Sequence, residues 1–244
     1  MIRVVAAVLL TMLSCFANPD FERGLQAYNQ SDWDGAIEAW ETIVAQGESS
    51  AELEFNLGNA YFRQERVDRA ILHYERALKL APGDSDARRN LLMANRAIVD
   101  QITEVPRLEI LQSLENARDA MSPKSLNTML LLFNGLLALC VGAMLYASGS
   151  VRDTLRRSSV LIAGLAVVSL LWYGWRSASA ARQEAIVMTE KSDVHSSPTD
   201  DSTQLFSLHA GTKVGLGETL SGWTEITLAD GRKGWIPADE IERI

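Results

Sequence analysis

The sequence is short of cysteine, histidine and positive charge. Its 244 residues include two cysteines, three histidines and 23 basic against 31 acidic side chains, for a net charge of −8. An acidic chain without basic runs is poorly suited to neutralise a phosphate backbone, so we expect no nucleic-acid partner. Both cysteines, Cys15 and Cys140, fall within or beside apolar runs. We therefore expect no internal disulfide, even in an oxidising compartment.

Motifs that carry catalysis are also missing. The sequence has no glycine-rich phosphate loop with a lysine and no paired-histidine zinc pattern. Its histidines, His73, His195 and His209, are far apart, and His73 is expected at an outward position of a helix. We predict no catalytic residue, no metal site and no cofactor, and therefore a protein that is not an enzyme.

Three long apolar runs are present, at 4–13, 126–147 and 159–175. The first run follows Arg3 and ends in small residues. This arrangement predicts a secretory signal peptide over 1–17, cleaved after Ala17. The alternative is a lipoprotein signal in which Cys15 carries the lipid.

The other two runs predict transmembrane helices at 126–147 and 159–175. A helix rises about 1.5 Å per residue, so these would extend roughly 33 Å and 25 Å, the second near the lower limit for crossing a bilayer. Trp172, Tyr173 and Trp175 suit the headgroup level at the end of the second run. Because the second run is short, a helical hairpin buried in a globular protein is the alternative.

The segments around these runs predict the topology. The loop 148–158 has three arginines and one aspartate, and short net-positive loops stay in the cytoplasm. Together with the signal peptide, this places both soluble regions on the periplasmic, extracytoplasmic side of the inner membrane. Linkers are expected at 106–125 and 176–184. Leucines at three-residue spacing predict an amphipathic helix in the first linker, either on the bilayer or packed on the preceding region.

The N-terminal third contains an internal repeat. Gly24 matches Gly58 at an offset of 34 residues, and aromatic Trp40 matches aromatic Tyr74 at the same offset. A period of 34 with small residues at fixed places is typical of stacked helical hairpins. Residues 51–84 resemble a tetratricopeptide repeat over its full length, and 17–50 resemble a degenerate copy from which Pro19 and the end at 46–48 depart. A repeat domain is therefore expected over 18–105. A third first-helix, 85–100, is expected to cap the array.

This resemblance implies a concave face, lined by the first helices, that binds extended or helical peptides. The residues it assigns to protein binding are Phe21, Tyr28, Glu52, Phe55, Asn59, Phe62, Arg63 and Arg89. Asn59 and Arg63 suit the gripping of a peptide because amide and guanidinium groups hydrogen-bond backbone and carboxylate. For Phe55 and Phe62, packing between neighbouring repeats is the alternative.

The C-terminal region, 185–244, has short apolar segments separated by glycine, serine, aspartate and proline, which predicts a small antiparallel barrel. Asp230 and Gly231 form a hairpin turn signal. The segments 208–214, 222–226 and 230–237 resemble a bacterial SH3-like domain, a family that binds peptides or cell-wall fragments. His195 stands where members of the family often carry arginine. Trp223 and Trp235 are expected in the core.

The predicted fold is thus a multidomain membrane protein: all-α tetratricopeptide hairpins, two transmembrane helices and a small all-β SH3-like barrel. This order resembles the repeat-containing, BatE-like member of the Bat aerotolerance family. The resemblance implies von Willebrand factor A domain membrane proteins and a MoxR-type AAA ATPase as partners, and a scaffold role in a stress or aerotolerance complex. The alternative function is a cell-wall sensor or localisation module that reads a peptidoglycan peptide and recruits a wall enzyme.

Overall fold

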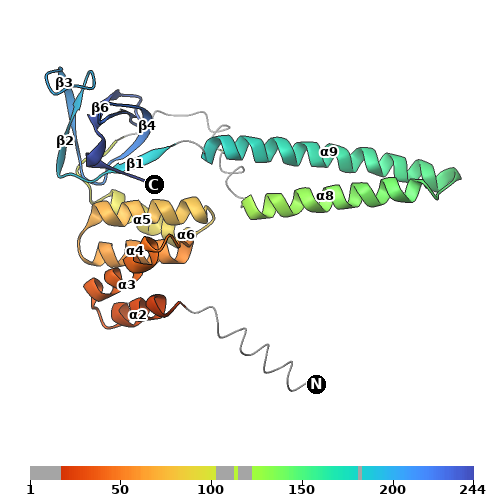
Figure 1. Cartoon of the computed structure of the whole chain (residues 1–244), viewed down its shortest axis with the longest axis horizontal. Coiled ribbons are helices and arrows are strands. Elements are labelled where there is room, and N and C mark those ends of the chain that lie inside the picture. The colour runs from red at the N-terminus through yellow and green to blue at the C-terminus, as the bar shows by residue number, and fades with distance from the viewer. Residues whose placement is uncertain (1–17, 103–112, 115–122, 181–182) are drawn as a thin grey trace. The chain divides into compact units, whose positions relative to one another are not determined.

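The computed structural model describes residues 18–102, 113–114, 123–180 and 183–244 (Figure 1). The described residues form two compact units. The first unit combines the helices before residue 103 with a C-terminal sheet, and the second contains two long helices that lie between them in sequence. The signal peptide predicted at 1–17 and most of the linker predicted at 106–125 lie outside the described residues.

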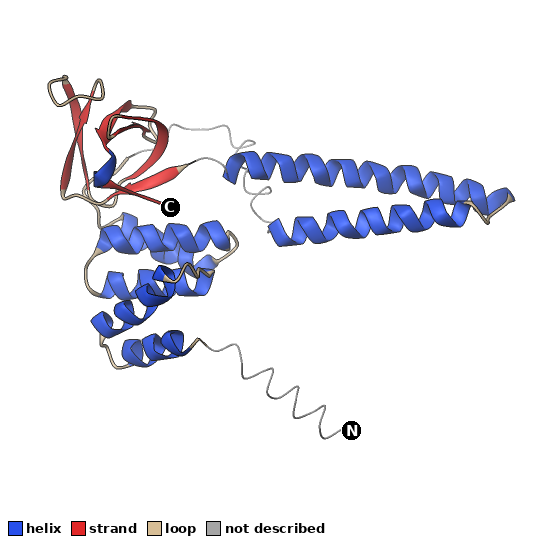
Figure 2. Cartoon of the chain, viewed as in Figure 1, coloured by secondary structure: helices blue, strands red, loops and turns tan. Residues whose placement is uncertain are grey.

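The helices of the first unit follow one another as antiparallel hairpins (Figure 2). They are α2 (Pro19–Asn29), α3 (Trp33–Ala45), α4 (Ala51–Arg63), α5 (Val67–Leu80) and α6 (Ser85–Asn95). Four of them begin at a side chain that accepts a hydrogen bond from the first turn: Asn18, Asp32, Ser50 and Asp84. Pro19, which departs from the repeat pattern, lies in the first turn of α2, where its missing N–H is not needed.

Each of the first two hairpins closes on a glycine and an aromatic ring. A Cβ atom on Gly58 would lie 2.6 Å from Cδ1 of Tyr74, and a Cβ on Gly24 would overlap the indole of Trp40. Both aromatic side chains are buried, and the Trp40 Nε1 donates to the Phe21 carbonyl at 3.2 Å. The repeated spacing of glycine and aromatic residue in the sequence is therefore a steric requirement for close helix crossing.

The second hairpin also buries an ionic cluster. His73 is 1% exposed, and its Nδ1 lies 2.7 Å from Oε2 of Glu54, which is 3% exposed. The Nε2 of His73 lies 3.6 Å from Oε1 of Glu41, and the Tyr61 hydroxyl donates to the same oxygen at 2.7 Å. The Tyr61 ring stacks on the imidazole at 5.2 Å.

The expectation that His73 points outward is wrong. Helix α5 buries five consecutive residues, 70–74, because α4, α6 and the C-terminal sheet all pack against it. A helix covered on several sides has no outward face at this point.

The C-terminal sheet has seven strands in the order β3-β2-β6-β5-β4-β1-β7, and the paired strands are antiparallel. The strands are β1 (Glu184–Val187), β2 (Lys191–His195), β3 (Gln204–His209), β4 (Lys213–Leu220), β5 (Trp223–Thr227), β6 (Lys233–Pro237) and β7 (Ile241–Arg243), with a 3-10 helix, η1 (Ala238–Glu240), before β7. The core comprises Ala185, Val187, Val194, Leu208, Val214, Ile226, Leu228 and Ile236.

Trp223 and Trp235, expected in this core, lie instead on the opposite face and are half-buried. Thr224, Ile226 and Ile236 take the inward positions of β5 and β6. Since side chains alternate along a strand, the two tryptophans point away from the core. They belong to a partly exposed surface of the sheet.

The sheet packs on helix α5 within the first unit. Ile186 of β1 is fully buried in the same apolar cluster as Ile71 of α5. Glu242 of β7 accepts from Arg69 at 2.7 Å and from Arg76 at 3.0 Å. Lys213 lies 2.9 Å from Glu75. This contact joins the repeats and the sheet into one packed body.

Asp100, beyond α6, adds a second contact to the sheet. Its carboxylate accepts from the His209 backbone N–H at 2.6 Å and from the Thr212 hydroxyl at 2.8 Å, and it lies 2.9 Å from Nδ1 of His209. Burial would raise the pKa of Asp100, but these hydrogen bonds outweigh burial and lower it. The carboxylate is therefore ionised in its contact with the sheet.

The second unit contains α8 (Pro123–Met144) and α9 (Gly149–Ala180), which pack along each other. Both contain windows long and apolar enough to cross a membrane, Ser125–Met144 and Gly149–Trp175, of which only 6% and 11% is buried. Polar side chains within the helices turn back to their own backbone, as Ser159 and Ser169 do to carbonyls four residues earlier. This exposed apolar surface suggests a membrane association.

The helix bounds differ from the segments expected between and after the spans. Most of the segment 148–158, expected as a loop, forms the first turns of α9, and α9 continues to Ala180 into the expected linker 176–184. The arginines Arg152, Arg156 and Arg157 therefore lie on the helix itself. Helix formation there agrees with the absence of glycine and proline from 150 to 163.

Candidate protein-binding groove

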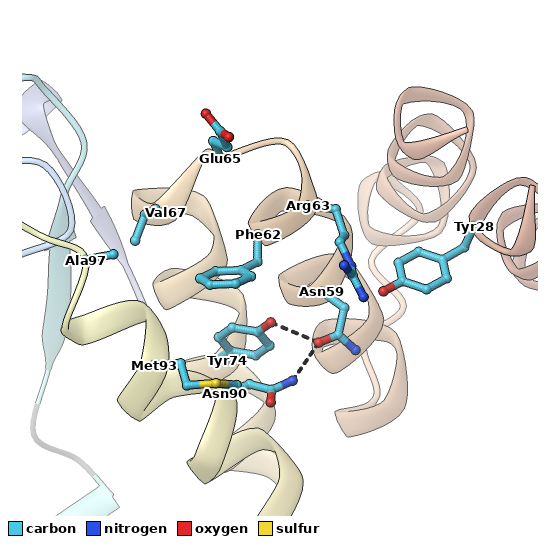
Figure 3. A pocket seen from close by; sticks show the side chains of 10 residues that line it. All are labelled: Tyr28, Asn59, Phe62, Arg63, Glu65, Val67, Tyr74, Asn90, Met93 and Ala97. Atoms are coloured by element: carbon cyan, nitrogen blue, oxygen red, sulfur yellow. Dashed lines mark hydrogen bonds between the residues drawn. The ribbon is translucent and has the colours of Figure 1, made fainter. Parts of the chain in front are cut away.

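A cavity of about 690 Å³ lies beside α4 and α6 (Figure 3). We call it the amide groove; its lining residues are Tyr28, Asn59, Phe62, Arg63, Glu65, Val67, Tyr74, Asn90, Met93 and Ala97. They come from α2, α4, α5, α6 and the turns next to them, so the groove exists only when successive hairpins stack.

A pair of amides forms the polar centre of the amide groove. The Asn59 Oδ1 accepts from the Tyr74 hydroxyl at 2.9 Å and from the Asn90 Nδ2 at 2.8 Å. Burial raises the pKa of Tyr74, so its hydroxyl keeps the proton that it donates. These bonds fix both amide orientations (Figure 3).

The remaining polar atoms of the two amides are one donor and one acceptor. Within the described part of the chain, neither the Nδ2 of Asn59 nor the Oδ1 of Asn90 has a hydrogen-bond partner. A peptide backbone offers the matching acceptor and donor at each residue. The amide groove can therefore hold an extended backbone in a fixed orientation.

Apolar side chains surround this amide pair. Phe62, Val67 and Met93 line the groove, and Met93 is about half exposed. Methionine adapts its shape to different partners, which suits a site that accepts an apolar side chain. Arg63 lies at the same groove, with its guanidinium 5.8 Å from the centre of the Trp33 ring. Such stacking holds a long cationic side chain in place.

A further cavity of about 510 Å³ lies near the N-terminal ends of α2 and α4. We call it the acidic groove; it is lined by Asn18, Phe21, Glu22, Leu25, Ile43, Glu48, Ser49, Ser50, Glu52 and Leu53. Glutamates supply its charge, and Phe21 and Leu25 supply half-buried apolar surface. Helix α4 contributes to both grooves.

The structure brings together part of the predicted binding set. Tyr28, Asn59, Phe62 and Arg63 line the amide groove, whereas Phe21 and Glu52 line the acidic groove.

Phe55 and Arg89 line neither groove. The Phe55 ring lies 6.1 Å from the Tyr74 ring and packs on the repeat core. Arg89 forms an ion pair with Asp86 on the exposed side of α6. Phe55 thus supports the groove from behind, as the packing alternative for this residue anticipated.

Sequence reasoning missed Asn90 and Tyr74 as groove residues. In the 34-residue register Asn90 aligns with Asn56, yet its partner in the groove is Asn59. The repeat period contains no signal for this pair, because the angle between α4 and α6 decides which side chains meet. The sequence identified Tyr74 only as the repeat equivalent of Trp40; its hydroxyl also reaches the groove.

The C-terminal sheet offers a separate candidate surface. Trp223, Trp235 and His195 share the face opposite the core, and His195 pairs with Trp235 across β2 and β6. The rings of His195 and Trp223 meet edge to face at 5.2 Å. The His195 Nδ1 also lies 3.2 Å from the Ser202 carbonyl.

A family model of the tetratricopeptide repeat matches residues 21–85, which begin in α2 and end at the start of α6. None of the curated proteins matches the chain. The matched range contains both glycine–aromatic crossings and the α4 side of the amide groove. The chain is therefore a tetratricopeptide-repeat-containing protein, and its repeats suggest a protein-interaction scaffold.

Proposed function

We propose that this protein is a non-enzymatic adaptor, anchored in a bacterial inner membrane, that holds partner proteins through its repeats and its C-terminal domain. The observation that carries the proposal is the oriented amide pair, Asn59 and Asn90, set among apolar side chains. A polar pair with one donor and one acceptor left over suits a peptide backbone, and the apolar rim suits one or two side chains.

Two contributions of similar size are expected in the free energy of peptide binding. Each net hydrogen bond to the amide pair contributes about 0.5–1.5 kcal/mol. A buried apolar side chain against Phe62 and Met93 contributes roughly 1.5–3 kcal/mol. After the loss of translational freedom is subtracted, the result is a modest affinity, as suits an adaptor that exchanges partners.

Membrane anchoring is assigned to α8 and α9. About 20 apolar residues cross a bilayer core of about 30 Å. Leu131, Leu139 and Val160 are each at least 70% exposed, and lipid tails would cover them.

The packing of the first unit supports a location of both soluble regions on one side. Helix α5 and the C-terminal sheet are in contact, so a membrane cannot separate them. The chain between Ile102 and Glu184 must then cross an even number of times, which α8 and α9 satisfy. Arginines in the first turns of α9 favour a cytoplasmic turn, and hence an extracytoplasmic first unit.

The specific partners rest on resemblance. The order of signal, repeats, two spans and SH3-like domain resembles the BatE-like proteins. Von Willebrand factor A domain membrane proteins and a MoxR-type AAA ATPase are accordingly the proposed partners, in an envelope complex linked to stress or aerotolerance.

Co-purification tests this function. The full chain, solubilised in detergent with von Willebrand factor A domain proteins from the same membrane, is expected to retain them, and Asn59→Ala with Phe62→Ala is expected to release them. Arg89→Ala is the matched control because Arg89 lies outside both grooves. If the unmodified chain, the double variant and Arg89→Ala retain the partners equally, the amide groove does not bind them.

A second function is favoured by one observation, the half-buried Trp223 and Trp235 on the sheet. Exposed aromatic rings suit peptide or sugar ligands, so the C-terminal domain would read a wall peptide and recruit a wall enzyme. Full chain retained on isolated sacculi, and lost with Trp223→Ala and Trp235→Ala, would support this function over the first.

A further inference from the structure

We propose that the partner segment held by the repeats is cationic: a short extended peptide with an apolar side chain in the amide groove and lysine or arginine over the acidic groove. This inference rests on the proposed function, since it names the chemistry of the ligand at the same site.

The acidic groove carries an unbalanced negative charge. Glu22, Glu48 and Glu52 line it, and neither lysine nor arginine is among its lining residues. Within the described residues, no ion pair engages any of the three. Among the described residues, the one side-chain hydrogen bond to these three carboxylates is that from the Asn18 Nδ2 to Glu48, at 3.4 Å. Three unpaired carboxylates around a concave apolar surface attract a cation that also has an aliphatic stem.

A purely structural role accounts for only part of this charge. Glu22 and Glu52 lie in the first turns of α2 and α4, where a carboxylate stabilises the helix dipole. Glu48 belongs to no helix; its carboxylate accepts from Asn18, the N-cap of α2, and pairs with no cation among the described residues. The apolar walls formed by Phe21 and Leu25 are likewise not needed to cap a helix.

Helix α4 links the two grooves at a spacing that a peptide can cover. Glu52 and Arg63 are eleven residues apart, close to three helical turns, so both lie on one face of α4 with Asn59 between them. That separation is roughly 16 Å at 1.5 Å per residue. An extended peptide rises about 3.3 Å per residue and spans it in about five residues.

The charges of the two grooves determine where along the peptide its basic side chains bind. Arg63 at the amide groove repels cationic side chains, while Glu22 and Glu52 attract them. The bound segment is therefore expected to place its basic residues about five positions from its apolar anchor.

The test is a peptide-display experiment. A library of random twelve-residue peptides is selected for binding to the full chain, which is immobilised in detergent. We expect enriched sequences with an excess of lysine and arginine near an apolar residue. A synthetic peptide of the enriched sequence should lose at least tenfold in affinity against Glu22→Lys with Glu52→Lys, and should bind more weakly at high salt.

Asp68→Lys is the matched control, because Asp68 has the same second position in α5 that Glu52 has in α4 but lies outside both grooves. It should leave the affinity unchanged. Enriched peptides without excess basic residues, whose binding is still lost with Asn59→Ala, would overturn the cationic ligand but leave the adaptor function standing. No enrichment at all, or binding indifferent to every groove variant, would overturn the adaptor function as well.

Discussion

The two hairpins α2–α3 and α4–α5 have the same backbone plan but differ in what they bury. The first places Ala27 and Ala39 where the second places Tyr61 and His73, at the 34-residue offset. Alanine fills its position without polar demands, whereas His73 needs Glu54 and Glu41 around it. In the second hairpin the buried histidine is matched by Glu54 of its own hairpin and by Glu41 from α3 of the neighbouring one.

The largest expected effect comes from breaking the cluster that only the second hairpin has. His73→Ala leaves the carboxylate of Glu54 buried without its partner, which should lower the free energy of unfolding by about 3–5 kcal/mol. Chemical unfolding of the full chain in detergent, followed by tryptophan fluorescence, measures it. Replacing both partners, in His73→Leu with Glu54→Leu, should be nearly neutral. A similar loss in the double variant would mean that packing, and not charge, matters at this site.

The glycine–aromatic crossing, shared by both hairpins, should respond alike in each. Gly58→Leu and Gly24→Leu force a side chain into Tyr74 and Trp40 and should each lower stability by about 1–3 kcal/mol. Gly83→Leu is the control, because a Cβ there meets nothing within 4 Å. The thermal unfolding midpoint is measured for the three variants. An unchanged midpoint for Gly58→Leu would contradict the close crossing of α4 and α5.

The sheet docks on α5 of the second hairpin. Glu242→Arg places a cation against Arg69 and Arg76, which are only partly exposed, and should destabilise the contact by roughly 1–3 kcal/mol. Limited proteolysis should then cut faster between the repeats and the sheet. Lys191→Glu is the control, because Lys191 opens β2 and forms its ion pair with Asp193 of the same strand. Equal cleavage of the two variants would show that these arginines do not hold the sheet.

The smallest effect is the pH dependence of the cluster around His73, a position that Ala39 occupies in the first hairpin. Burial would lower the pKa of His73, but the neighbouring carboxylates of Glu41 and Glu54 outweigh burial and raise it above 6.5. The imidazole of His73, against the effect of burial, lowers the pKa of Glu41 from 4.5 to about 2.

Stability from His73 is therefore complete below pH 6.5 and is lost as the pH rises through its raised pKa. Stability from Glu41 is complete above pH 4.5 and is lost as the pH falls toward 2. The unfolding midpoint is measured between pH 3 and 9 for the full chain and for the His73→Leu, Glu54→Leu variant. The difference between the two midpoints should be largest between these two pH limits. A flat difference would refute the charged pair.

Sequence patterns predicted the features that repeat or run long. The period of 34 located Gly24, Gly58 and their aromatic partners because a close crossing admits only a small residue. The apolar runs located α8 and α9, since helix length and hydropathy are local properties.

Features that depend on how elements meet were not predictable. His73 was expected at an outward position of its helix, and the neighbours of α5 make it buried. Trp223 and Trp235 looked like core residues because large rings usually are; the smaller inward residues of β5 and β6 decided otherwise. Asn90 reached the amide groove through the α4–α6 packing angle, which no periodicity encodes.

The contact of β1 and β7 with α5 has a consequence for chain connectivity. Ile102 packs on the core of the sheet, and Glu184 opens its β1 strand, so the polypeptide leaves and rejoins the same folded body. The pair of helices α8 and α9 is then an insertion into one discontinuous unit, not a spacer between two independent domains. Replacing it with a short flexible connector should leave that unit intact in water, ready for ligand measurements without detergent.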